Sequence, residues 1–163
     1  AVGDPVKLSG DGDSVRGLAG VALAAAGDPV VGVILAIGTN PDGGPYVNPS
    51  DLSVVKAPAT KTQAYYILVA DDPNIIFEIQ EVGGGTQLTS TEIGLNVNFV
   101  AASPATGVNV SGFMVNNSGE ATTAALNLKL LCLQRRAGNA FGAYAKWLVL
   151  ISNHAYRSGI TGV

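Results

Sequence analysis

The chain has 163 residues, of which 47% are hydrophobic, 6% aromatic and only 13% charged, and its formal net charge is −3. This length fits one domain, which buries about 68–70% of the surface exposed by the unfolded chain. The high apolar content excludes an intrinsically disordered chain. The nine basic and twelve acidic residues disfavour an electrostatic nucleic-acid binder, which needs a basic stripe. We therefore predict one globular domain without a nucleic-acid partner.

The first 14 residues are rich in Gly and Asp and lack the periodicity of a full-length strand. Residues 1–14 are therefore predicted to be an extended N-terminal arm that is mobile in the free protein and becomes ordered against a neighbouring subunit. Its apolar side chains, available for that contact, are Val2, Val6 and Leu8. The next segment, Val15–Ala26, is the only helix candidate, and Gly17 and Gly20 weaken it.

Short runs of β-branched, aromatic and other apolar residues follow, separated by turn signals rich in Gly, Pro, Asn and Asp. In chain order they are Val30–Ile37, Tyr65–Ala70, Ile75–Gln80, Ile93–Phe99, Val108–Val115, Ala125–Leu133 and Ala145–Ile151. This pattern predicts an all-β single domain, with a β-sandwich or jelly-roll-like architecture, over residues 15–156. Residues 157–163 are predicted to form a C-terminal tail.

The last two predicted strands are apolar on both faces. In Ala125–Leu133, alternation places Cys132 on the face of Leu128 and Leu130, and Leu131 and Leu133 on the opposite face. In Ala145–Ile151, Trp147 faces one way, and we expect it to be buried. Strands of this kind lie between two layers, or between a core and a partner subunit. We therefore expect the surface that contacts a partner protein or another subunit to include Val2, Val6, Leu8, Leu131, Leu133, Leu148, Leu150 and Tyr156.

Residues suited to catalysis or metal binding are few. Cys132 is the only cysteine and His154 the only histidine, which excludes an internal disulfide and a Cys/His metal cluster. Ser152 lies near His154 in the sequence, but no nucleophile elbow is present. The Asp71-Asp72 pair fits a turn best, with calcium ligation or acid–base catalysis as alternatives. We therefore predict that the protein is not an enzyme and binds no cofactor.

The sequence also lacks the patterns expected of a membrane span and of a signal peptide. No apolar run reaches the roughly 20 residues of a membrane span. The first residues, Ala-Val-Gly-Asp, lack the basic and apolar regions of a signal peptide. We therefore expect a protein that is made in a cytoplasm and has no membrane partner.

A series of short motifs carries a resemblance to a known class of proteins. The motifs are Tyr65–Pro73, Phe77–Glu81, Gly94–Asn96, Asn127–Leu130, Ala145–Val149 and Asn153-His154. Over roughly residues 29–156, the chain resembles small structural proteins of tailed-bacteriophage virions, and most of all the head decoration, or cement, proteins. The resemblance implies an all-β, usually trimeric, non-enzymatic protein on the capsid exterior. Its partner would be the major capsid protein, and it would be made in the host cytoplasm.

A second hypothesis is a receptor- or carbohydrate-binding β module of a phage tail or fibre, and a third is a small β-barrel enzyme. A ligand-binding module requires a cluster of exposed aromatic side chains. The candidates are Tyr46, Tyr65, Tyr66, Tyr144, Trp147 and Tyr156. The aromatic content of 6% favours the cement protein over this alternative.

Overall fold

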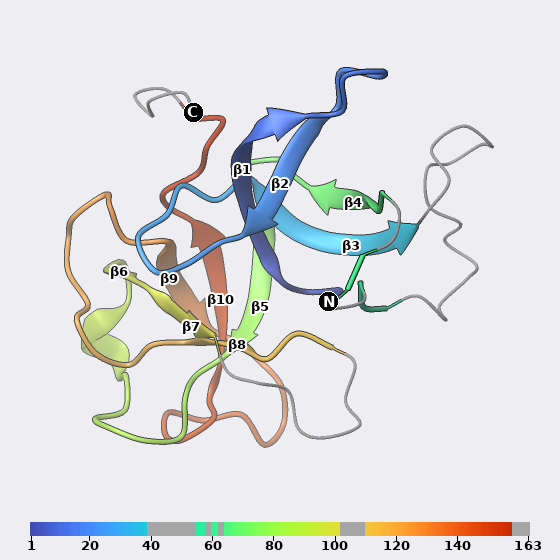
Figure 1. Cartoon of the computed structure of the whole chain (residues 1–163). Coiled ribbons are helices and arrows are strands. Elements are labelled where there is room, and N and C mark those ends of the chain that lie inside the picture. The colour runs from blue at the N-terminus through green and yellow to red at the C-terminus, as the bar shows by residue number, and fades with distance from the viewer. Residues whose placement is uncertain (39–54, 58–59, 62–63, 102–109, 158–163) are drawn as a thin grey trace.

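The computed structural model describes residues 1–38, 55–57, 60–61, 64–101 and 110–157 (Figure 1). Within these residues the chain forms ten β-strands and one short 3-10 helix, η1 (Ser90–Glu92). The all-β, single-domain prediction is confirmed. Tyr46, the first part of the predicted strand Val108–Val115 and most of the predicted tail lie outside the described residues. The strands are β1 (Pro5–Gly12), β2 (Ala19–Leu23), β3 (Gly32–Gly38), β4 (Tyr66–Ala70), β5 (Ile76–Gln80), β6 (Asn96–Val97), β7 (Phe99–Ala101), β8 (Phe113–Val115), β9 (Leu128–Leu133) and β10 (Lys146–Ile151).

The first sheet has the strand order β2-β1-β3-β4, and all its pairs are antiparallel. The second strand in this order is β1, so the prediction that this segment is an extended N-terminal arm is wrong for residues 5–12. Val6 pairs with Leu23 on one side and Gly32 on the other, and it is only 2% exposed. Two ladders and this burial offset the entropy cost of ordering the segment, so residues 5–12 belong to the folded domain.

The helix candidate Val15–Ala26 is also wrong, because residues 19–23 form β2 and pair with β1. Gly17 has a φ of +69°, which is left-handed backbone suited to the hairpin turn and incompatible with a right-handed helix. The pairing with a neighbouring strand therefore determines the structure of this segment, and local helix propensity does not.

The second sheet has the order β5-β10-β9-β6, again antiparallel throughout. A β-bulge interrupts the β9–β10 ladder, because Val149 pairs with Leu130 and Leu148 with Cys132, which leaves Leu131 without an opposite residue. One extra residue in a strand exchanges the faces of the residues that follow it. Leu133 therefore packs toward the core beside Trp147, and Cys132 shares the outer face with Leu148. The predicted face assignment of Cys132 and Leu133 is wrong for this reason.

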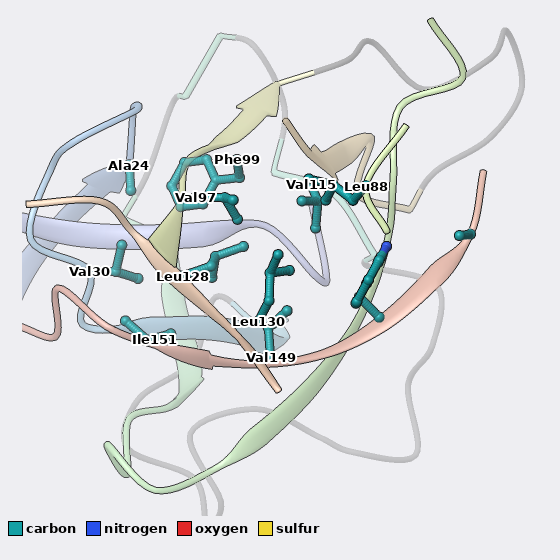
Figure 2. Close-up of a cluster of buried hydrophobic side chains, with 12 residues drawn as sticks. Ala24, Val30, Leu88, Val97, Phe99, Val115, Leu128, Leu130, Val149 and Ile151 are labelled. Atoms are coloured by element: carbon teal, nitrogen blue, oxygen red, sulfur yellow. The ribbon is translucent and has the colours of Figure 1, made fainter. Parts of the chain in front are cut away.

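The described residues form two separate hydrophobic clusters. The larger one contains the inward side chains of β9 and β10 with residues of β6, β7 and β8 and of the β2–β3 connection (Figure 2). Trp147 is 0% exposed in it, as the sequence predicted. The smaller cluster lies on one face of the first sheet, around Val6, Ile34 and Ile37.

Buried asparagines join the β2–β3 connection to the second sheet. The amide of Asn127 accepts a hydrogen bond from the backbone N–H of Gly27 (3.0 Å) and donates to the carbonyl of Asp28 (2.9 Å). The amide of Asn153 donates to the carbonyl of Gly27 (3.0 Å). These bonds satisfy backbone groups of a buried turn and attach it to the strands that form the larger cluster.

Candidate interaction surfaces

Three of the eight predicted interface residues lie in or against the hydrophobic clusters. Val6 is a core residue, Leu133 packs against the larger cluster, and Val2 packs against the smaller one. The backbone N–H of Val2 also donates to the carbonyl of Val55 (2.9 Å). These three residues therefore pack within the folded domain, Val6 buried and Val2 and Leu133 half-buried, and their role in an interface stays a prediction.

The remaining five side chains are accessible to solvent. Leu8, Leu131, Leu148 and Leu150 are half-buried, and Tyr156 is 53% exposed. None of the five belongs to either hydrophobic cluster. Of these residues, the strand register brings together only Leu148 and Leu150, which lie two residues apart on the outer face of β10.

The outer face of the second sheet is the first candidate surface. Leu148 lies between Glu78 of β5 and Cys132 of β9, and Leu150 lies between Ile76 and Lys129. Ile76 is 55% exposed although it is aliphatic. The face thus has an apolar centre with charged side chains on both flanking strands.

The charged residues around this face have partners of their own. Arg136 donates to the carboxylate of Glu78 (2.9 Å), and the Lys129 ammonium donates to the carbonyl of Gly94 (3.1 Å). Both contacts are exposed, so each contributes little to the stability of the domain. They nevertheless hold charged groups at the rim of the apolar centre, which is the arrangement found in protein–protein interfaces.

The Asp71-Asp72 pair lies in a turn beside the C-terminal segment. The Asp72 carboxylate accepts hydrogen bonds from the backbone N–H (2.8 Å) and the side-chain amide (3.2 Å) of Asn74, as an Asx turn does. The Arg157 guanidinium donates to the carbonyl of Pro73 (2.6 Å). Among the described residues, no group of three or more His, Cys, Asp or Glu side chains is placed to hold a metal ion. The turn interpretation is therefore the one that the described contacts favour.

His154 lies inside the domain and is 0% exposed. Its Nδ1 accepts a hydrogen bond from the backbone N–H of Tyr156 (3.1 Å), so in the neutral ring the proton is on Nε2. Burial lowers the pKa of His154 below its usual value, and the nearby Arg157 guanidinium lowers it further, against the opposing effect of Asp71. In this tautomer Nε2 cannot accept a proton from Ser152, so the arrangement does not form a Ser–His pair.

A groove runs over the first sheet and is the second candidate surface. Its volume is about 1410 Å³, and it is open to solvent. Lys56 and Lys61, both exposed, contribute to its lining. Its apolar lining includes Leu8, Val21, Ile34, Tyr65, Ile67 and Val69.

Sequence reasoning missed several exposed apolar side chains, among them Ile76 and Val15. Ile76 was predicted only as part of an alternating strand, yet its position beside Leu150 makes it part of the outer face. Val15 is 81% exposed at the end of the β1–β2 hairpin, where the sequence predicted a helix. The Asp-x-x-x-Gly spacing of residues 13–17 was the available signal for a turn at that point.

Comparison of the chain with protein-family models, with curated proteins and with solved structures found no match. Among the described residues, no helix has the length and apolar character that crossing a membrane requires.

Proposed function

We propose that this protein is a structural virion protein that binds the outer surface of a phage capsid as an oligomer, a trimer, and stabilises the shell by bridging capsomers. The partner is the major capsid protein, and the role requires neither a cofactor nor a catalytic group. The observation that carries the proposal is the apolar outer face of β10, formed by Leu148 and Leu150. The low charged content of 13% and the resemblance of the motifs support it.

The outer face has the composition expected for binding another protein surface. Its centre is aliphatic, with Ile76 next to Leu150, and its flanks carry Glu78 and Lys129. Burying each leucine more fully against the shell contributes up to about 1.5–3 kcal/mol. A single small face binds weakly, but an oligomer that engages several capsomers at once gains avidity without additional types of contact.

The alternative, a receptor- or carbohydrate-binding module, has less support. Trp147 has the largest aromatic surface for stacking on a sugar ring, and it is fully buried with its indole N–H bonded to Glu81. Tyr66 interacts with Asp13 and Arg16. Tyr144 and Tyr156 are exposed, at 58% and 53%, and remain the candidates for a ligand contact.

Binding to assembled shells tests the proposal. The probe is the empty shell formed by the major capsid protein of the same viral genome, and the variants are Leu148→Gln and Leu150→Gln in the full chain. We expect each variant to bind shells about tenfold more weakly, which corresponds to about 1.4 kcal/mol.

The matched control is Leu35→Gln, because Leu35 is also a strand leucine, is 53% exposed and lies in the first sheet. It should bind shells like the unchanged protein. If the unchanged protein binds immobilised glycans and does not bind shells, the ligand-binding module is correct and the capsid proposal is wrong.

A further inference from the structure

Residues 153–157, which we call the C-terminal segment, follow β10 and connect the second sheet to the first. The backbone N–H of Val30 donates to the carbonyl of Asn153 (2.8 Å), and the backbone N–H of Ala155 donates to the carbonyl of Val30 (2.8 Å). Val30 precedes β3 of the first sheet, whereas Asn153 follows β10 of the second (Figure 1). Val30 is 0% exposed and belongs to the larger hydrophobic cluster. The C-terminal segment therefore lies against a buried junction between the two sheets.

The same segment contacts the turn between β4 and β5, where the chain crosses from the first sheet to the second. The Arg157 guanidinium donates to the carbonyl of Pro73 in this turn (2.6 Å). On the other side, the pairing of His154 with Val30 is an isolated parallel bridge and not part of a longer ladder. A segment held by one bridge and a few hydrogen bonds can open locally while the strands of both sheets stay paired.

The imidazole of His154 lies at the centre of this segment and is 0% exposed. Its Nδ1 accepts the hydrogen bond from the backbone N–H of Tyr156 (3.1 Å), so Nε2 carries the proton of the neutral ring. Among the described residues, this buried Nε2 has no hydrogen-bond partner. A buried polar group without a partner costs free energy, so the ring is incompletely satisfied in the closed segment even when it is neutral.

Protonation of His154 removes the hydrogen bond that the neutral ring does form. Both nitrogens of an imidazolium are donors, so Nδ1 would then face a backbone N–H that is also a donor. Asp71 and Asp72 of the β4–β5 turn face the ring and favour its charged form. Arg157 opposes that form, and the β2–β3 connection contributes the apolar Val30. Burial has the largest effect and lowers the pKa, so the closed segment favours the neutral ring.

We propose that the C-terminal segment is an acid-sensitive closure of the junction between the two sheets, which opens when His154 is protonated and leaves the sheets themselves folded. Opening breaks the hydrogen bonds to Val30 and Pro73 and exposes Val30. It also displaces Tyr156, which lines the groove over the first sheet. This device goes beyond the proposed function, because it is a property of the domain whether or not the protein binds a shell.

Amide hydrogen exchange of the full chain, measured by NMR between about pH 7.5 and about pH 5.0, tests this opening. Dividing each rate by the intrinsic rate of an unstructured amide gives an opening constant. The reporter is Ala155, and the reference is the buried Leu130, whose N–H donates to the carbonyl of Leu95 (3.0 Å). We expect Leu130 to exchange only when the whole domain unfolds, and Ala155 to have the larger opening constant.

The opening constant of Ala155 should also increase as the pH falls. The open segment binds a proton with the ordinary histidine pKa of about 6.5, whereas the closed segment binds it only at lower pH. The increase between the two pH values should therefore be several-fold, and up to about thirtyfold. This direction is the one expected for a group whose pKa is lowered by burial.

Two controls separate this effect from a general sensitivity to acid. The backbone N–H of Gln134 donates to the carbonyl of Lys146 (2.8 Å) at the opposite end of β10, so local opening there should not change with pH. In His154→Gln, the opening constant of Ala155 should stay the same over this pH range, because no group titrates at that position. The comparison of Ala155 with Leu130 uses the unchanged protein, so it decides the question even if this variant does not fold.

Two results would overturn the inference. Equal opening constants for Ala155 and Leu130 would show that the C-terminal segment opens only when the whole domain unfolds. An opening constant of Ala155 that is the same at both pH values would show that opening is not linked to His154. Neither result bears on shell binding, which Leu148→Gln and Leu150→Gln test separately.

Discussion

The indole N–H of Trp147 donates a hydrogen bond to the carboxylate of Glu81 at 2.9 Å, and both side chains are completely buried. The other carboxylate oxygen accepts a hydrogen bond from the backbone N–H of Leu88 (2.9 Å). The backbone N–H of Glu81 also donates to the carbonyl of Ala145 (2.8 Å). A carboxyl group inside a core is tolerated only with such partners, so Glu81 connects the end of β5, β10 and the Leu88 loop.

Two substitutions of Trp147 should therefore distinguish the contribution of its ring volume to stability from the contribution of its hydrogen bond. We expect Trp147→Phe to lower the free energy of unfolding by about 1–3 kcal/mol, because it leaves a buried carboxylate oxygen without a donor. Trp147→Ala should lower it by about 3–5 kcal/mol, because it also creates a cavity. Urea denaturation measures both values. Tyr144→Phe, at an exposed aromatic residue, is the control, and an effect of Trp147→Phe as small as that of the control would contradict the prediction.

The side chain of Asn127 should contribute strongly to stability although it is polar. Asn127→Ala leaves the N–H of Gly27 and the carbonyl of Asp28 without their partner, which we expect to cost about 2–4 kcal/mol. Thermal denaturation with a matched Asn74→Ala control checks this, because Asn74 is exposed and should change stability by less than about 0.5 kcal/mol. Equal melting temperatures for the two variants would show that the buried amide bonds are unimportant.

Gly32 is required by the close approach of β3 to β4. A Cβ at this position would lie 2.1 Å from the carbonyl oxygen of Ala70, so Gly32→Ala must displace one strand. We expect a loss of stability of about 1–3 kcal/mol or more. Gly84→Ala is the control, because its Cβ would meet nothing within 4 Å. A Gly32→Ala variant as stable as Gly84→Ala in guanidinium denaturation would rule out this explanation.

The buried His154 should make the domain less stable in mild acid. Its pKa is lowered by burial, so between this folded-state pKa and the usual value near 6.5 the unfolded chain binds the additional proton. The contribution of neutral His154 is therefore complete above about pH 6.5 and declines as the pH falls toward the folded-state pKa. Charges facing the ring come from Asp71, Asp72 and Arg157.

Comparing the unchanged protein with His154→Gln measures this contribution. The free energy of unfolding should fall more between about pH 7.5 and about pH 5.0 in the unchanged protein than in the variant, which has no group titrating at that position. Parallel curves for the two proteins would mean that His154 has the same pKa in the folded and unfolded states.

Local patterns were sufficient to locate most strands. Period-two alternation in residues 75–80 and 145–151 corresponds to β5 and β10, and the burial of Trp147 follows from the same pattern. The outer position of Leu148 and Leu150 could also be predicted, because β10 contains no extra residue that would exchange its faces. Alternation within one strand is a property of the chain itself, which explains this success.

The errors arise where pairing between distant segments determines the structure. Nothing in residues 125–133 specifies that Leu131 bulges, because the bulge is defined only by the register with β10. Likewise, the Gly- and Asp-rich residues 5–12 become a strand because β2 pairs along this segment and β3 pairs with Pro5 and Val6. The loop that contains Val15 is in turn joined to β4 by a hydrogen bond from Arg16 to the hydroxyl of Tyr66, fifty residues away.

By itself, the sequence determined the all-β class, the positions of most strands along the chain and the inward and outward faces of the regular ones, because these depend on composition and on alternation along a single strand. Only the tertiary structure decided that residues 5–12 are part of a sheet, that Leu133 packs against the core and that Val15 is exposed. These outcomes depend on the register between strands and on long-range hydrogen bonds, and no local pattern in one chain encodes either of them.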